Sequence, residues 1–79
     1  MKAALLYIIS AIAENPDKIN IQEEESGDLI IFKVTVDKAD MGKVIGKNGK
    51  VIRAIRNVLK IPAIKQNKKI NIELSENPN

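Results

Sequence analysis

The 79-residue sequence contains no cysteine and no histidine, and Tyr7 and Phe32 are its only aromatic residues. Without cysteine, the chain can form neither a disulfide nor a thiolate metal site. Without histidine, it lacks the side chain that most often acts as an acid or base near neutral pH and most often ligates metals. We therefore predict no enzyme activity, no metal site and no bound cofactor.

A long hydrophobic run is also missing, since no stretch approaches the roughly 20 apolar residues of a membrane-spanning helix. Residues 3–13 are mostly apolar, follow Lys2 and end in an Ala-Ile-Ala sequence that resembles a signal-peptide cleavage site. One lysine is a weak basic region, however, and cleavage after Ala13 would leave a peptide shorter than the usual ~15–30 residues. The larger apolar side chains recur at helical spacing, at Leu5, Ile8, Ile9 and Ile12. We interpret this segment as a core helix of a cytoplasmic domain without membrane contact.

Two strands follow this first helix, which we expect to cover residues 2–14. Alternating apolar and polar residues predict a β-hairpin in which the first strand begins at Ile19 and the second covers residues 29–36. The turn between them falls at residues 26–28, where Ser-Gly-Asp is a typical turn sequence. The second strand has four apolar residues on one face, so this face should belong to the core.

Two helices come next in the pattern. A short helix over residues 38–45 can be capped by Asp37 or Asp40. A longer helix begins near residue 50, and Pro62 should end or kink it. Its apolar residues fall at helical spacing, at Val51, Ile52, Ile55, Val58 and Leu59.

A third strand completes the chain, because period-two alternation returns over residues 70–74. Residues 75–79 should be frayed, as chain ends often are. The sequence therefore predicts one α+β domain over residues 1–79 in the order α-β-β-α-α-β. Its helices should pack on one face of a three-stranded sheet.

Charge is distributed unevenly behind a formal net charge of +3. Residues 1–37 carry three lysines against seven acidic residues, a net charge of −4, and residues 70–79 carry two glutamates. Residues 38–69 carry ten basic residues against Asp40 alone, which gives this segment a net charge of +9. Such a segment produces a local positive field. It is often only a solvated lysine face, but here it surrounds two glycines, which favours an anion site.

These glycines lie in the sequence Val-Ile-Gly-Lys-Asn-Gly-Lys-Val-Ile, residues 44–52. An Asn-Gly pair can form a hairpin turn, but the helical spacing after it argues against strands. A phosphate-binding P-loop requires G-x-x-x-x-G-K-[ST]. Residues 42–47 are one residue short of that spacing, and Asn48 stands where serine or threonine is needed. A dinucleotide-binding G-x-G-x-x-G sequence is absent as well.

We therefore interpret residues 46–49 as a tight turn between two helices. Glycine adopts positive φ readily and lets a ligand approach the backbone closely. The turn leads into a helix N-terminus, whose free N–H groups and dipole favour an anion, and Lys47 and Lys50 add positive charge. This combination predicts a site for a phosphodiester backbone.

Residues 45–55 resemble the I-G-x-x-G-x-x-I-x-x-I signature of KH domains. In KH domains, the G-x-x-G loop clamps about four nucleotides of single-stranded nucleic acid. The order α-β-β-α-α-β is that of type II KH domains, and the chain is similar in length and layout to the short bacterial single-KH proteins of the KhpA type. The resemblance covers essentially the whole chain. Its one departure is Pro62, where such a domain is expected to have a smooth helix end.

The resemblance implies a set of RNA-binding residues. Gly46 and Gly49 would be the loop glycines, and Lys47 and Asn48 the variable pair that contacts phosphates. The flanking residues implied in the site are Lys43, Val44, Ile45, Lys50, Ile52 and Arg53. Val44 and Ile52 would help to line a base groove between the two helices and the edge of the strand over residues 29–36. Neither aromatic residue lies near the loop, so base contacts would be aliphatic and hydrogen-bonded rather than stacked.

Two functions remain open. The resemblance implies a protein that binds single-stranded RNA and acts as a post-transcriptional regulator or an RNA chaperone. It also implies a protein-interaction subunit that forms a homodimer or pairs with a larger KH-containing RNA-binding protein. KH domains that serve only as scaffolds usually lose the G-x-x-G loop or fill it with acidic residues, whereas this loop keeps Lys47. We therefore favour RNA binding.

Overall fold

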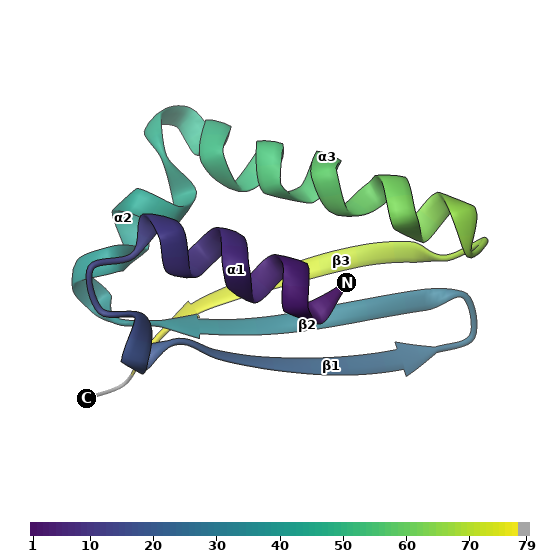
Figure 1. Ribbon diagram of the computed structural model, residues 1–79, viewed down its shortest axis with the longest axis horizontal. Helices are drawn as coiled ribbons and strands as arrows, with labels where there is room; N and C mark the ends of the chain where they lie inside the picture. The colour runs from purple at the N-terminus through teal and green to yellow at the C-terminus, as the bar shows by residue number, and fades with distance from the viewer. Residues whose placement is uncertain (78–79) are drawn as a thin grey trace.

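The computed structural model describes residues 1–77, which form a three-stranded sheet and three α-helices (Figure 1). The elements, in chain order, are α1 (Lys2–Ile12), the 3-10 turn η1 (Pro16–Lys18), β1 (Asn20–Ser26), β2 (Leu29–Val36), α2 (Lys38–Ile45), the 3-10 turn η2 (Lys47–Gly49), α3 (Lys50–Lys65) and β3 (Lys69–Glu76). The predicted order α-β-β-α-α-β and the α+β class are confirmed, and both agree with a type II KH fold.

The sheet is mixed and has β2 at its centre. β1 pairs with β2 in antiparallel register, and β3 pairs with it in parallel register on the other side. The inward-facing side chains of β2 are all at most 1% exposed: Ile30, Phe32, Val34 and Val36. This confirms the predicted apolar face, whereas Leu29 and Ile31 on the opposite face are only half-buried.

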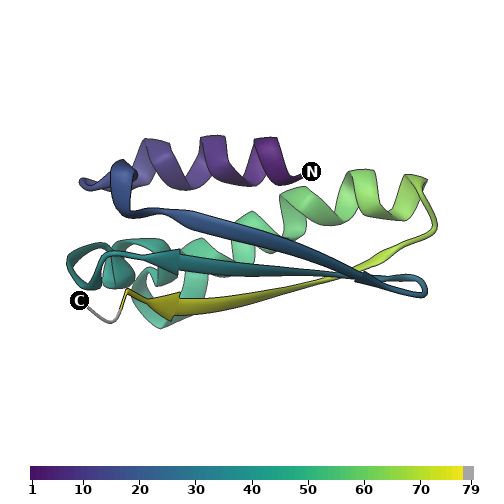
Figure 2. The ribbon, with the colours of Figure 1, turned by 90° about the horizontal axis from the view of Figure 1, so that it is seen from below.

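All three helices lie on one face of the sheet, as the two views in Figures 1 and 2 show. α1 packs over β1, and α3 packs over β3. The core between the two layers draws on every helix and strand: Leu5, Ile9, Ile21, Ile30, Phe32, Val34, Val36, Val44, Ile55, Leu59 and Ile72. The α2–α3 connection lies at one end of the molecule, and the β1–β2 turn lies at the other (Figure 1).

Pro62 does not end α3, which continues to Lys65. Proline lacks an N–H and therefore removes one hydrogen bond from a helix interior. Ala63, however, is 1% exposed, and its carbonyl accepts hydrogen bonds from the N–H groups of Gln66 at 3.0 Å and Lys68 at 2.8 Å. Of the two predicted effects of Pro62, an end of the helix is wrong, because burial of Ala63 and these bonds hold the last turn. A kink at Pro62 stays a prediction.

β3 also extends further than expected. Ser75 and Glu76, which we expected to be frayed, pair with Thr35 and Val36 of β2. The N–H of Asn77 then donates to the Val36 carbonyl at 2.7 Å. The expectation of a frayed end is wrong for Ser75 and Glu76, and its last two positions, residues 78–79, lie outside the described residues.

Candidate nucleic-acid interface

α2 ends in a turn that only glycine fits. Asp37 caps the start of the helix, and its carboxylate accepts the Ala39 N–H at 3.1 Å. At the other end, the Gly46 N–H donates to the Gly42 carbonyl at 2.8 Å. Gly46 has a φ of 75°, and a Cβ at this position would lie 2.3 Å from Cγ2 of Val51. The end of α2 is thus packed directly against the first turn of α3, which fixes the shape of the loop.

Gly49 serves the loop for a different reason. Its φ is 73°, but a Cβ there would meet no atom within 4 Å. Asn48 before it also has a positive φ, 57°, which asparagine tolerates better than most residues. Two successive left-handed residues turn the chain from α2 into α3, so Gly49 is needed for its backbone angle and Gly46 for both its angle and its lack of a side chain.

Gly46→Ala should therefore destabilise the domain more than Gly49→Ala. A positive φ costs a residue with a Cβ about 1–2 kcal/mol at either position. At Gly46, the added methyl group also overlaps Val51, which should cost about 1–3 kcal/mol more. Thermal melts of both variants measure the difference, and equal melting temperatures would contradict the close packing of Gly46 against Val51.

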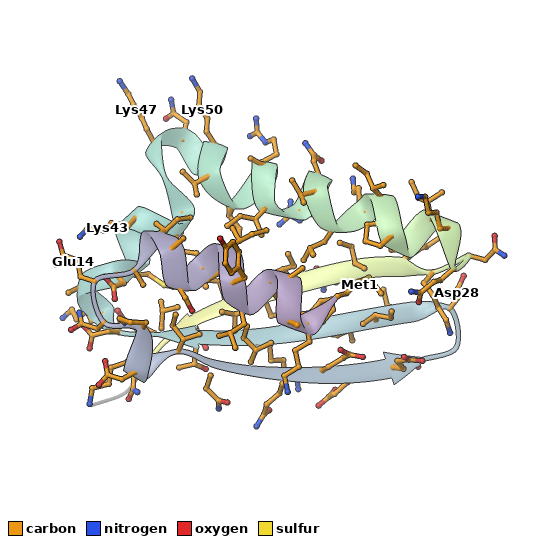
Figure 3. All side chains as sticks on the ribbon, viewed as in Figure 1. Met1, Glu14, Asp28, Lys43, Lys47 and Lys50 are labelled. Atoms are coloured by element: carbon orange, nitrogen blue, oxygen red, sulfur yellow. The ribbon has the colours of Figure 1, made fainter. Side chains whose placement is uncertain are left out.

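The loop presents its polar side chains to solvent. Lys47 and Asn48 are exposed, as is Lys50 in the first turn of α3, and Figure 3 shows Lys47 and Lys50 directed away from the rest of the molecule. None of the ion pairs between residues 1–77 includes Lys47, Lys50 or the exposed Arg53. No side chain caps α3, although the Lys50 N–H already donates to the Lys47 carbonyl. The positive end of the helix dipole adds to the potential of the exposed cations at this place.

Lys43 differs from these cations because it is already paired. Its ammonium group forms an ion pair with the carboxylate of Glu14, which follows the end of α1 (Figure 3). Both side chains remain accessible, at 41% exposed for Lys43 and 71% for Glu14. Lys43 therefore lies beside the loop and is paired with a carboxylate of the same chain.

The apolar residues expected in the site are less exposed than predicted. Val44 is completely buried, so its side chain belongs to the core and offers no surface to a base. Ile45 and Ile52 are half-buried at the base of the loop. The predicted groove edge is also wrong, because β2 pairs on both sides and has no free edge. The free edge on the α3 side of the sheet belongs to β3, so a groove between the helices and a strand edge would follow β3.

The sequence did not predict the role of Asp40, which was a candidate cap of α2, whereas Asp37 is the cap. The side chain of Asp40 is completely buried and accepts the backbone N–H groups of Glu14 and Asn15, each at 2.9 Å. The hydrogen bond from Glu14 is the main cause that lowers the pKa of Asp40, with help from Asn15 and the charge of Lys43, while burial acts in the opposite direction. Asp40 thus fixes the end of α1 to α2. Its position four residues before Val44, on the inward side of the helix, is the only feature of the sequence that indicates this role.

An apolar groove of about 430 Å³ lies between α1 and α3. Its lining consists of Ile8, Ile12, Lys50, Val51, Ala54, Ile55 and Val58. Val58, one of the apolar residues at helical spacing, is 52% exposed, and Ile61 three residues later is 60% exposed. α3 therefore carries a second apolar stripe, beside the one that faces the sheet, and residues 1–77 leave this stripe uncovered.

The part of the chain that the structure describes has neither a candidate metal site nor a candidate membrane-spanning helix. Residues 1–77 contain no cluster of acidic side chains that could hold a metal ion. None of the helices in the same range combines the length and the hydrophobicity needed to cross a bilayer.

Comparison with known proteins matches almost the whole chain to one family. Residues 2–74 match the family model described as the KH domain of KhpA/KhpB. An RNA-binding protein KhpA of Chlamydia trachomatis is 38% identical over 76 residues, which cover 96% of this chain and 97% of that protein. The proteins of the same name from Clostridium perfringens and Listeria monocytogenes are 39% and 36% identical, over 94% and 96% of this chain and 99% and 100% of their own lengths.

Proposed function

Since the chain belongs to the KhpA/KhpB family of KH domains, we propose that it is an RNA-binding protein that holds single-stranded RNA at residues 46–49. The relatives named as RNA-binding proteins match over almost their full lengths, which supports RNA as the ligand. The observation that carries the proposal is the exposed turn between α2 and α3, with its unpaired cations Lys47 and Lys50.

The proposed mechanism is a phosphate clamp. The turn brings backbone within reach of the RNA, and the N-terminal end of α3 and the two lysines face the phosphates. Arg53, one turn further along α3, extends the positive surface, and Ile45 and Ile52 supply aliphatic contacts at its base. We place this function in the cytoplasm and propose a role in post-transcriptional regulation or as an RNA chaperone, without catalysis.

A phosphate clamp predicts strongly salt-dependent binding. About four phosphate contacts, each with a single-strand slope near −0.7, give a slope of roughly −3 for log affinity against log salt. Raising the salt from ~50 to ~200 mM should then weaken binding by roughly 50-fold. Fluorescence anisotropy with end-labelled RNA of randomised sequence measures this slope, and a flat response would exclude the clamp.

We also propose that the uncovered apolar stripe of α3 and the groove beside α1 bind a second copy of this chain. Val58 and Ile61 on α3 are 52% and 60% exposed, and a two-fold dimer would bring the same patch of both copies together. A larger KH-containing protein of the same family is the alternative occupant, because a domain with this fold could offer a similar face.

Val58→Asp should convert such a dimer into a monomer. A carboxylate in the centre of an apolar interface would lose its hydration without gaining a partner. Asn57→Asp is the matched control, since it adds a negative charge at the neighbouring exposed position of the same helix. Light scattering on both variants gives the mass, and a parent protein that is monomeric at all concentrations would leave the larger KH protein as the occupant to test.

A further inference from the structure

The ion pair between Lys43 and Glu14 connects the candidate RNA site to a segment distant in the sequence. Lys43 lies in the last turn of α2, three residues before Gly46, so its ammonium group is beside the loop. Glu14 lies just beyond the end of α1. The two charges meet in the free protein, and Figure 3 shows both side chains on the side of the molecule that carries the α2–α3 turn.

The position of Glu14 is fixed by the fold. Its N–H donates to Oδ1 of the buried Asp40 at 2.9 Å, and the next N–H, of Asn15, donates to Oδ2 of the same carboxylate at 2.9 Å. Asp40 and Lys43 lie one turn apart on α2. The backbone of Glu14 is therefore held one turn from Lys43, which keeps the two exposed side chains within reach of each other.

We propose that Glu14 is part of the RNA-binding site and competes with RNA phosphate for Lys43. The inference rests on the proposed function. A lysine ammonium group has three donors and could touch two anions at once. That arrangement would bring the Glu14 carboxylate close to a phosphate, and like charges at such a distance repel each other. RNA therefore gains Lys43 only by displacing Glu14, and Glu14 lowers the affinity of the site.

The competition has a distinct salt signature. Bound RNA that leaves Lys43 paired with Glu14 makes one phosphate contact fewer, and the counterion of that phosphate stays with the RNA. The parent protein should therefore show a shallower salt slope than a protein in which Lys43 always meets phosphate. Without the carboxylate, the contact between Lys43 and phosphate should count in full, which steepens the single-strand slope by at most about 0.7.

A double-mutant cycle tests the proposal, with Glu14→Gln, Lys43→Gln and the combination measured by anisotropy on end-labelled single-stranded RNA of randomised sequence. Glu14→Gln should tighten binding by about two- to five-fold, the range expected for an exposed ion pair, and should steepen the salt slope. In the Lys43→Gln background, the same change should have no effect. Glutamine keeps the backbone N–H that Asp40 holds, and thermal melts verify that each variant is folded.

Glu24→Gln is the matched control. It removes the same charge and also breaks an ion pair, with Lys33 at 3.2 Å, but on the β1–β2 hairpin. If Glu14 acts only through its long-range field, Glu14→Gln should tighten binding equally with and without Lys43, and this result would overturn the proposal. An unchanged affinity in Glu14→Gln would overturn it too.

The same titrations separate this inference from the proposed function. A variant with aspartate at positions 47 and 48 is included as the reference for the loop. Loss of binding in that variant together with a cycle that shows no coupling would leave the clamp intact and reject the role of Glu14. Full binding in that variant would reject the clamp, and the cycle would still decide whether Glu14 and Lys43 are coupled in RNA binding. No binding by the parent protein would reject both.

Discussion

RNA affinity should fall by at least about 30-fold, or about 2 kcal/mol, when Lys47→Asp and Asn48→Asp are combined. The two changes place negative charges where phosphates would approach, so attraction becomes repulsion. The fold should survive, because both side chains are exposed and aspartate tolerates the positive φ of Asn48 nearly as well as asparagine. Anisotropy on labelled single-stranded RNA and a thermal melt of the same sample give both results.

A matched pair at the other end of α3 controls for net charge. Lys65→Asp with Asn67→Asp makes the same chemical changes, and Asn67 also has a φ of 57° and is exposed. Both double variants lower the formal net charge from +3 to zero. If the two lose RNA binding equally, the interaction depends on overall charge rather than on the loop. If the loop variant loses binding only because it loses a dimer, as light scattering would show, the loop is primarily a protein interface.

The sequence predicted most of what depends on neighbouring residues. The alternation over residues 29–36 predicted both β2 and its buried face, because a strand turns successive side chains to opposite sides. Asp37 and Gly46 mark the ends of α2, and the predicted bounds of that helix are those observed. The turn at residues 46–49 could be predicted because its two glycines interrupt helical spacing on both sides.

The sequence did not predict features that depend on contacts between distant segments. Asp40 holds the N–H groups of residues 14 and 15, and nothing in local periodicity indicates a partner so far along the chain. The central place of β2 depends on which strands pair, so the expected groove edge was wrong. Pro62 alone predicts a helix end, but the burial of Ala63 overrides that local preference.

The candidate site itself combines both kinds of information. Its cations and glycines could be read from residues 43–53, since a charged turn between helices is a local pattern. The sequence did not show which of these cations are free for a ligand, because the pairing of Lys43 with Glu14 depends on the fold. The burial of Val44 follows from packing as well, so one expected groove residue proved to be a core residue.

Phe32→Ala should have the largest effect on stability, a loss of about 3–5 kcal/mol. Phe32 is the largest fully buried side chain and lies on the central strand, beneath the helices that carry the loop. A domain of this size has a total stability of roughly 4–12 kcal/mol, so the substitution removes much of it. The melting temperature should fall by roughly 12 °C or more.

Ile31→Ala is the matched control, because it shortens the neighbouring side chain on the opposite, half-buried face of the same strand. It should cost only about 1 kcal/mol, since less apolar surface returns to water. At a temperature where Ile31→Ala is fully folded, this variant should still bind RNA. Phe32→Ala should lose RNA binding in proportion to its unfolded fraction, because Phe32 affects the loop only by keeping the domain folded. Similar melting temperatures for the two variants would show that the core does not lie on the face of β2 that carries Phe32.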